Sequence, residues 1–563
     1  MTTAGPRAVR RRRGRGRDAL TAESCPTLAA GVAFEPTAEG SGWLVTVQGV
    51  PSARLSRPVV DLLTAMDGRT AVSALRARFA AGETDESVLR LMERFRDNGL
   101  LDGGASRLPG RVTYRPPFTV QFATLRASAL FARLDRVVVP VPRRAVLAIV
   151  AAVVGAGIVG AALHLGELGA VLARPVPLAG FALVVVALGL ATLVHETAHG
   201  LTLTRLGGRP RRAGFMLLYL TPAFFVDITD GWRLPDRRHR VAIALAGPAV
   251  HATVAAVAML AALALPSSAA RETLLLLAIS CTVVVLVNLI PFVRFDGYLA
   301  LMSALDEPNL RRRSIRDGAG FLARLLFGAP RQPRALERWW SVPFGLCCLA
   351  APVIMVLFAV VRTAQLLDGG GPAASLFVLT LEAVVVVAGV VLLVRALVRM
   401  WRSGASRFRL VGVTAALAAG IVAAGILVPV PTAAVLGFSV DDDRVVLVQG
   451  GRDPGTRIPD GAPVILSTRG ILASEYRGEG TIRTRPATET EVPVEALFPV
   501  RTPGASVPAT AVAEVEVSGE RSALPAAGQA RVQLGTAPLW QALWAAVASP
   551  LAALTSEEER GLP

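Results

Sequence analysis

The chain has 563 residues, 53% of them hydrophobic, and a mean hydropathy of +0.51. It is too long for one ordinary domain and too apolar for a soluble multidomain enzyme, so we predict a polytopic membrane protein. Basic residues outnumber acidic ones by 59 to 42, but they stand beside apolar runs rather than in one patch. This pattern is typical of membrane topology and argues against a nucleic acid partner. Four scattered cysteines indicate neither a disulfide framework nor a sulfur-rich metal site.

The N-terminal residues predict a tail followed by a small domain. Residues 1–22 are rich in arginine and lack the apolar core of a signal peptide, so we expect a disordered basic tail. Residues 23–104 predict three short strands and then three helices, at Arg57–Met66, Val72–Ala80 and Asp85–Asn98. This order is typical of a winged-helix-like domain, which needs no ligand.

Short segments of this domain also resemble the PqqD-like family. They are CPTLAAGV at 25–32, RLS at 54–56, MDGRT at 66–70 and NGLL at 98–101. The resemblance implies a domain that recognises the leader of a ribosomally made, modified peptide by pairing the leader as an added strand. The partner implied for this domain is therefore a precursor peptide.

Seven apolar runs of about 20 residues, the length of a membrane span, follow a predicted juxtamembrane linker at 105–142. The runs are Ala145–Leu163, Leu178–Thr204, Val241–Leu265, Thr273–Phe292, Val342–Val361, Ala374–Val394 and Leu410–Val430. Arginines flank them mainly on one side, which predicts a multi-pass protein of the cell membrane with a cytoplasmic N-terminus. An odd number of spans predicts that the C-terminal domain is extracytoplasmic.

The second run carries the sequence His195-Glu196-Thr197-Ala198-His199. On a helix this spacing places the two imidazoles on one face, where they can share a zinc ion, with Glu196 beside the metal-bound water. The alternative is a pair of histidines on a packed helix.

The fourth run supplies a candidate third ligand in the sequence NLIPFVRFDG at 288–297. Pro291 should interrupt the helix, and Asp296 near membrane depth requires a partner. Asp296 could instead pair with Arg294 at the interface, with Gly297 ending the helix.

Together the two motifs resemble the site-2 protease family of intramembrane zinc metalloproteases, the M50 peptidases. The resemblance covers Leu178–Tyr298 and includes Ala246-Gly247-Pro248. It implies a catalytic membrane core at 143–305 that holds one Zn²⁺ per chain. The implied zinc ligands are His195, His199 and Asp296; Glu196 is the implied general base, and Asn288 the implied partner of the substrate backbone or zinc water. We expect His251 to be a buried structural histidine.

Three connecting segments lie around this core. Gly214–Val226 is too short to span and predicts a re-entrant hairpin that pairs with extended substrate; the alternatives are a lipid-facing interfacial strand and a packed connection. The loop Asp227–Arg240, with Trp232 and Arg233, should face anionic headgroups. The cytoplasmic loop at 306–341 should form an interfacial belt, and 342–430 holds the additional spans.

The composition changes after residue 430. Short alternating segments between proline and glycine turns predict an extracytoplasmic β-domain at 431–563. It weakly resembles the barrel and lipoyl-like parts of HlyD-type membrane-fusion proteins. Pro538–Leu554 predicts an amphipathic helix on the membrane surface or a further span.

Joined together, the N-terminal domain, the membrane core and the β-domain resemble M50-type proteases encoded in gene clusters for modified peptides, including daptide-like ones. The resemblance implies leader removal from a precursor peptide, with a possible ABC peptide exporter as a second partner and the lipid bilayer as surroundings. Two alternatives remain. One is regulated intramembrane proteolysis of a signalling protein; the other is a non-catalytic exporter adaptor or immunity protein.

Overall fold

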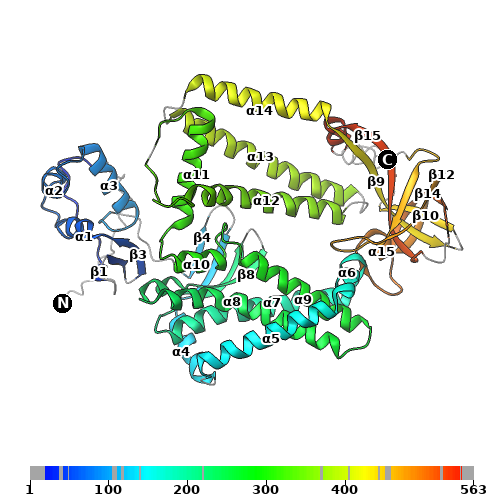
Figure 1. Cartoon of the computed structure of the whole chain (residues 1–563), viewed down its shortest axis with the longest axis horizontal. Coiled ribbons are helices and arrows are strands. Elements are labelled where there is room, and N and C mark those ends of the chain that lie inside the picture. The colour runs from blue at the N-terminus through cyan, green and yellow to red at the C-terminus, as the bar shows by residue number, and fades with distance from the viewer. Residues whose placement is uncertain are drawn as a thin grey trace, which may run out of the picture. The chain divides into compact units, whose positions relative to one another are not determined.

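The computed structural model describes residues 20–36, 42–48, 50–103, 111–115, 119–138, 141–218, 221–331, 333–367, 372–402, 406–441, 444–450, 458–519, 524–545 and 547 (Figure 1). Most of the predicted basic tail, residues 1–19, lies outside them. The chain divides into two compact units, the first comprising Met1–Pro140, Leu193–Gly247 and Ser303–Pro308, and the second the remainder. The boundaries fall inside three continuous helices, α7, α8 and α10, whose bounds are given below.

The first unit begins with a small domain of three strands and three helices. Its elements are β1 (Val32–Pro36), β2 (Trp43–Val47), β3 (Val50–Leu55), α1 (Arg57–Thr64), α2 (Val72–Phe79) and α3 (Asp85–Asp97). The strands form an antiparallel sheet in the order β1-β2-β3. The elements agree with the predicted ones to within a few residues, because local signals mark their ends: Thr84 caps α3 by accepting a hydrogen bond from the Ser87 N–H at 3.2 Å, and Gly99 follows α3 with φ +73°.

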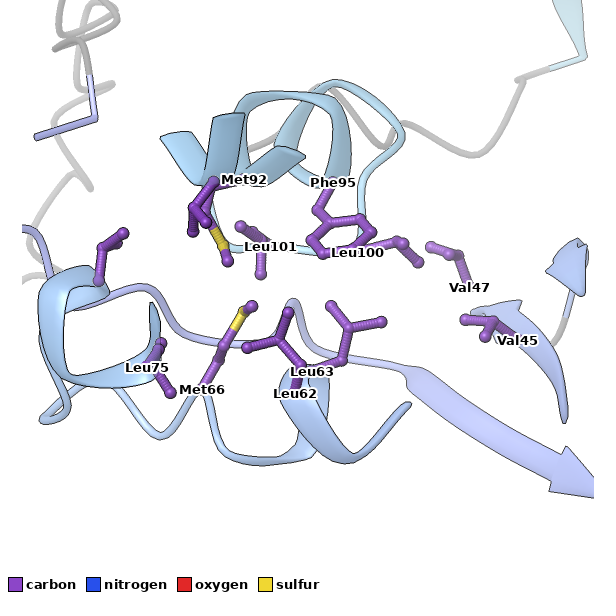
Figure 2. Packing of buried hydrophobic residues seen from close by; sticks show 12 residues of the cluster. Val45, Val47, Leu62, Leu63, Met66, Leu75, Met92, Phe95, Leu100 and Leu101 are labelled. Atoms are coloured by element: carbon purple, nitrogen blue, oxygen red, sulfur yellow. The ribbon is translucent and has the colours of Figure 1, made fainter. Parts of the chain in front are cut away.

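One apolar core holds this domain together (Figure 2). Val45 from the sheet, Leu63 from α1 and Met92 from α3 are each fully buried. The apolar residues of α3 recur at the spacing of one helix face, so the helix buries that stripe against the sheet and α1.

A second sheet in the first unit differs from the prediction. Its strands are β4 (Val112–Arg115), β5 (Thr119–Thr124), β7 (Ala213–Leu218) and β8 (Thr221–Val226), all antiparallel in the order β4-β5-β7-β8. The predicted hairpin at Gly214–Val226 is therefore part of a larger sheet. The predicted linker at 105–142 contributes two strands and α4 (Ala127–Val137). Strands β5 and β7 are about ninety residues apart, and pairing over such a separation leaves no local sequence pattern.

A polar cluster joins β3 to two later segments of the first unit. The Asp306 carboxylate contacts the Arg54 guanidinium at 2.8 Å and also contacts Arg240, at the start of α8. Both guanidinium groups lie over the Trp232 ring, 5.7 and 5.3 Å from its centroid. We call these four residues the Asp306 cluster. The half-buried Trp232 ring thus packs against protein cations, and the prediction that its loop faces anionic headgroups stays a prediction.

Seven helices of the described chain are long and apolar enough to cross a membrane, as the sequence predicted. They are α5 (Arg143–Leu163), α7 (Leu178–Arg205), α8 (Arg237–Leu263), α9 (Ala269–Asn288), α12 (Ser341–Leu367), α13 (Pro372–Arg402) and α14 (Arg407–Leu427). Helix α9 ends four residues before the predicted end, because Pro291 prevents its continuation.

Shorter elements connect these helices. They are α6 (Leu165–Ala173), β6 (Val176–Pro177), the 3₁₀ helix η1 (Thr229–Arg233), α10 (Asp296–Ala304) and α11 (Leu310–Phe327). The predicted cytoplasmic loop at 306–341 thus contains an ordered helix. Helix α11 packs closely on α12, since a Cβ at Gly345 would overlap the backbone of Ser314.

The C-terminal part forms a closed six-stranded barrel, yellow to red in Figure 1. Its strands are β9 (Pro429–Asp441), β10 (Arg444–Gly450), β11 (Pro463–Ser467), β12 (Tyr476–Pro493), β14 (Ser506–Val517) and β15 (Ala527–Pro538); α15 (Val494–Leu497) and β13 (Val500–Arg501) lie between β12 and β14. The last five of these strands contain the five strand segments that the sequence predicts, at Val445–Val448, Val464–Leu466, Gly480–Arg483, Ala513–Val517 and Ala530–Leu534. Strand β9 was missed because it follows α14 directly and its apolar residues prolong the run of the last span. Residues 539–545 and 547 are helical and lie within the helix predicted at Pro538–Leu554, whose residues 546 and 548–554 lie outside the described ones.

Candidate metal centre

The histidine pair lies on α7 as the spacing predicted. His195 and His199 are 5% and 3% exposed. Their Nε2 atoms are 3.2 Å apart, and the two rings meet edge to face. At that distance the two Nε2 atoms cannot both carry a proton, so at least one of them presents a lone pair.

A backbone carbonyl sets the tautomer of His199. Its Nδ1 lies 2.6 Å from the carbonyl oxygen of Ile243 on α8. A carbonyl only accepts, so Nδ1 carries the proton and donates it. In the neutral ring Nε2 is then a lone-pair donor, the form in which histidine binds a metal.

Gly247 on α8 leaves room for this pair. A Cβ at this position would overlap the Nε2 atoms of both histidines. Any side chain here would therefore occupy the space that the two lone pairs share. The sequence contained Gly247 in the Ala-Gly-Pro motif, but nothing in the motif indicated that the hydrogen atom of glycine faces the histidines.

Asp296 is the first residue of α10, and it completes the set. One ligand atom each from His195, His199 and Asp296 lies within 4.8 Å of the other two, and this is the one such group of three among the described residues. A turn after α9 brings the chain to Asp296, and Gly297 is needed there because a Cβ would overlap the Leu289 carbonyl. The Arg311 guanidinium holds the same turn by donating to the Phe292 carbonyl at 3.0 Å.

Glu196 lies next to His195 in sequence and faces the sheet. Its Oε2 accepts a hydrogen bond of 2.9 Å from the N–H of Val226, the last residue of β8. Helix α4 supports this arrangement, because the Phe131 ring fills the space beside Gly200 that a Cβ would take. The backbone contact to Val226 was not predicted, since backbone donors leave no signal in a sequence.

The residues fit a divalent metal. Two imidazoles and one carboxylate are a common donor set for catalytic zinc. Tetrahedral zinc with Zn–N bonds of about 2.05 Å places two ligand nitrogens about 3.3 Å apart, which matches the 3.2 Å between the two Nε2 atoms. The group can therefore bind a metal ion.

Two further predicted residues have other surroundings. The Asn288 side-chain N–H donates to the Val284 carbonyl of its own helix at 3.0 Å, so its described hydrogen bond is local. The assignment of Asn288 to substrate or zinc water stays a prediction. His251, one turn after Gly247 on α8, is buried with 1% exposure.

Comparison of the chain with models of protein families, with curated proteins and with solved structures gave no match.

Proposed function

We propose that the protein is a membrane-embedded zinc metallopeptidase. One observation carries this proposal: ligand atoms of His195, His199 and Asp296 converge within 4.8 Å, and Glu196 stands between the two histidines in sequence. A bound Zn²⁺ would polarise the peptide carbonyl and make the attacking water more acidic. The three converging residues would hold the ion.

Glu196 is the proposed general base. It accepts a proton from the attacking water and passes that proton to the leaving nitrogen of the cleaved peptide bond. The hydrogen bond from the Val226 N–H orients the carboxylate without neutralising its charge. The same bond fixes the position of Glu196 relative to the end of β8.

The proposed substrate is a peptide bound in extended form. Within the described residues β8 is an edge strand of its sheet, and its last residue contacts Glu196. A peptide added along this edge would run toward the general base with its backbone unwound, as hydrolysis requires. By resemblance, this peptide is a precursor whose leader binds the N-terminal domain on the cytoplasmic side, with the barrel on the opposite side of the membrane.

The test compares full-length protein in detergent with Glu196→Gln and His199→Ala, using a candidate leader–core precursor. Glu382→Gln is the control, because Glu382 is another carboxylate of an apolar helix, α13. We expect wild type and Glu382→Gln to contain one zinc per chain and to cut the precursor. Glu196→Gln should keep zinc but lose at least about 10³-fold in kcat, while His199→Ala should lose zinc.

Equal cutting by wild type and Glu196→Gln would contradict the proposed chemistry. Zinc-free wild type would favour the non-catalytic adaptor. Cleavage of a membrane-anchored signalling protein, with the precursor left intact, would support the peptidase activity. It would show that the substrate is a signalling protein and not a precursor peptide.

A further inference from the structure

A hollow lined by arginines lies beside α11 and the segment that leads into α12. Its volume is about 510 Å³. We call it the arginine pocket. Five arginines line it: Arg316, Arg324, Arg331, Arg334 and Arg338. All five are exposed, so their guanidinium groups are accessible to a ligand from outside the protein.

The positive charge of the pocket is not balanced by the protein. Two carboxylates, Asp317 and Glu337, also line it, so five positive charges against two negative ones leave +3. In the described part of the chain, none of the five arginines makes an ion pair. Neutralisation must therefore come from solvent ions or from an anionic ligand.

Asp317 holds the backbone of the pocket in place through hydrogen bonds and is not itself available to pair with the arginines. Its two carboxylate oxygens accept hydrogen bonds from the backbone N–H groups of Ala335 (2.6 Å) and Leu336 (3.1 Å) and from the Ser341 hydroxyl (2.8 Å). The Arg313 guanidinium donates to the Ala335 carbonyl from the same helix. These bonds fix the loop that carries Arg334 and Arg338, so the pocket is largely shaped before a ligand binds.

The surroundings of the pocket are those of a membrane interface. Helix α12, one of the seven apolar helices, begins at Ser341, immediately after the loop. Trp339 is 82% exposed beside the arginines, and Leu325 on α11 is 62% exposed. Exposed tryptophan and leucine beside arginine are typical of the layer in which lipid headgroups meet the acyl chains.

We propose that the arginine pocket binds the phosphate-bearing headgroup of an anionic phospholipid. Guanidinium groups bind phosphate oxygens through paired, charge-assisted hydrogen bonds, and basic hollows next to membrane helices suit such headgroups. The exposed Trp339 and Leu325 favour a lipid over a soluble phosphate compound, because a lipid also supplies acyl chains to cover them. This inference is independent of the metal centre.

The test is native mass spectrometry of full-length protein titrated in detergent with dioleoyl phosphatidylglycerol or dioleoyl phosphatidylcholine. The variant is Arg334→Gln/Arg338→Gln, which removes two of the five arginines that line the pocket. The control is Arg143→Gln/Arg144→Gln, which removes the same charge from the start of another apolar helix, α5. Two arginines at a membrane surface correspond to roughly a 30-fold change in affinity.

We expect the pocket variant to lose roughly 30-fold in phosphatidylglycerol affinity. The control should bind phosphatidylglycerol as wild type does. Phosphatidylcholine should bind wild type, the pocket variant and the control equally. Equal loss in the control would overturn the proposal in favour of general charge attraction. Full competition by millimolar inorganic phosphate would instead assign a soluble phosphate ligand. Preferential binding of a polyglutamate peptide would assign an acidic protein partner. Thermal unfolding of each variant verifies that its fold is intact.

Discussion

Two clusters in this protein each place one aspartate beside two basic side chains, a pair of arginines in one and a pair of histidines in the other, yet their charges differ. In the Asp306 cluster the carboxylate contacts two guanidinium groups, which are always charged, so the cluster carries a net charge of +1 by itself. In the proposed metal site, formed by His195, His199 and Asp296, the aspartate lies near two imidazoles whose Nε2 atoms are 3.2 Å apart and cannot both be protonated.

This difference is the reason why we propose Asp296, and not Asp306, as a metal ligand. The Asp306 carboxylate, which contacts two charged donors, is already compensated and needs no ion. A carboxylate beside imidazole lone pairs is different, because one cation can bind the carboxylate and the imidazole nitrogens at the same time. The type of nitrogen, rather than the presence of an acidic residue, therefore separates the two clusters.

The largest effect should come from removing each carboxylate in turn. Asp296→Asn should lower zinc affinity by roughly 10²–10³-fold, since a four-ligand zinc site worth about 12 kcal/mol assigns about 3 kcal/mol to each ligand. Asp306→Asn should leave zinc affinity unchanged. Zinc content after dialysis against a chelator series measures both. Equal zinc loss in Asp296→Asn and Asp306→Asn would contradict the proposal that Asp296 binds the metal and Asp306 does not.

A smaller effect should come from filling the space between the histidines. In Gly247→Ala the added Cβ overlaps both Nε2 atoms, so the rings must shift apart. We expect zinc affinity to fall by roughly 10–100-fold, the range found when the orientation of ligands is disturbed. The control is Gly189→Ala on α7, where a Cβ meets nothing within 4 Å.

The same chelator titration and a thermal melt separate the two glycine variants. Gly189→Ala should retain zinc and melt no lower than wild type, because alanine favours a helix. Unchanged zinc affinity in Gly247→Ala would mean that the zinc ion does not lie between the Nε2 atoms of His195 and His199.

These residues also show where sequence reasoning succeeds. Two histidines four residues apart on an apolar run could be assigned to one helix face, because helical periodicity is local. The apolar runs likewise predicted all seven long helices, since length and hydropathy are properties of a continuous segment.

The rest depended on contacts between distant segments. The Ile243 carbonyl that orients His199 and the Val226 N–H that orients Glu196 are backbone groups, which every residue has. The sequence predicted only that the basic loop of Trp232 faces anionic headgroups. The contact of the Trp232 ring with Arg54 and Arg240 could not be predicted, because only the folded chain brings these residues together.

The third prediction concerns the stability of the Asp306 cluster. Arg240 is 5% exposed, so Asp306→Asn leaves a buried guanidinium with a neutral partner. We expect the contact between the N-terminal domain and the rest of the first unit to weaken by about 2 kcal/mol, or roughly 30-fold. Limited trypsin cleavage within the N-terminal domain should accelerate accordingly.

The matched control is Asp135→Asn, which removes the pair with Arg205. Both side chains of that pair are about one third exposed, at 35% and 33%, so its loss should cost less than about 1 kcal/mol. Equal cleavage rates in Asp306→Asn and the control would mean that the Asp306 cluster does not hold the domain.

The smallest effect concerns a carboxylate whose partners are backbone donors. Asp67 accepts hydrogen bonds from the N–H groups of Arg69 (2.8 Å) and Thr70 (2.9 Å), and these bonds lower the pKa of Asp67. The resulting stabilisation is fully present above the unfolded pKa of about 3.9 and is lost as the pH falls through the lower folded pKa. The ¹³C carboxyl signal of Asp67 in selectively labelled full-length protein, identified by its absence in Asp67→Asn, should therefore titrate with a midpoint below 3.9. A midpoint at or above 3.9 would show that uncharged backbone donors do not stabilise the ionised form of this carboxylate. The contrast between Asp306 and Asp296 would then rest on arginine and histidine partners alone.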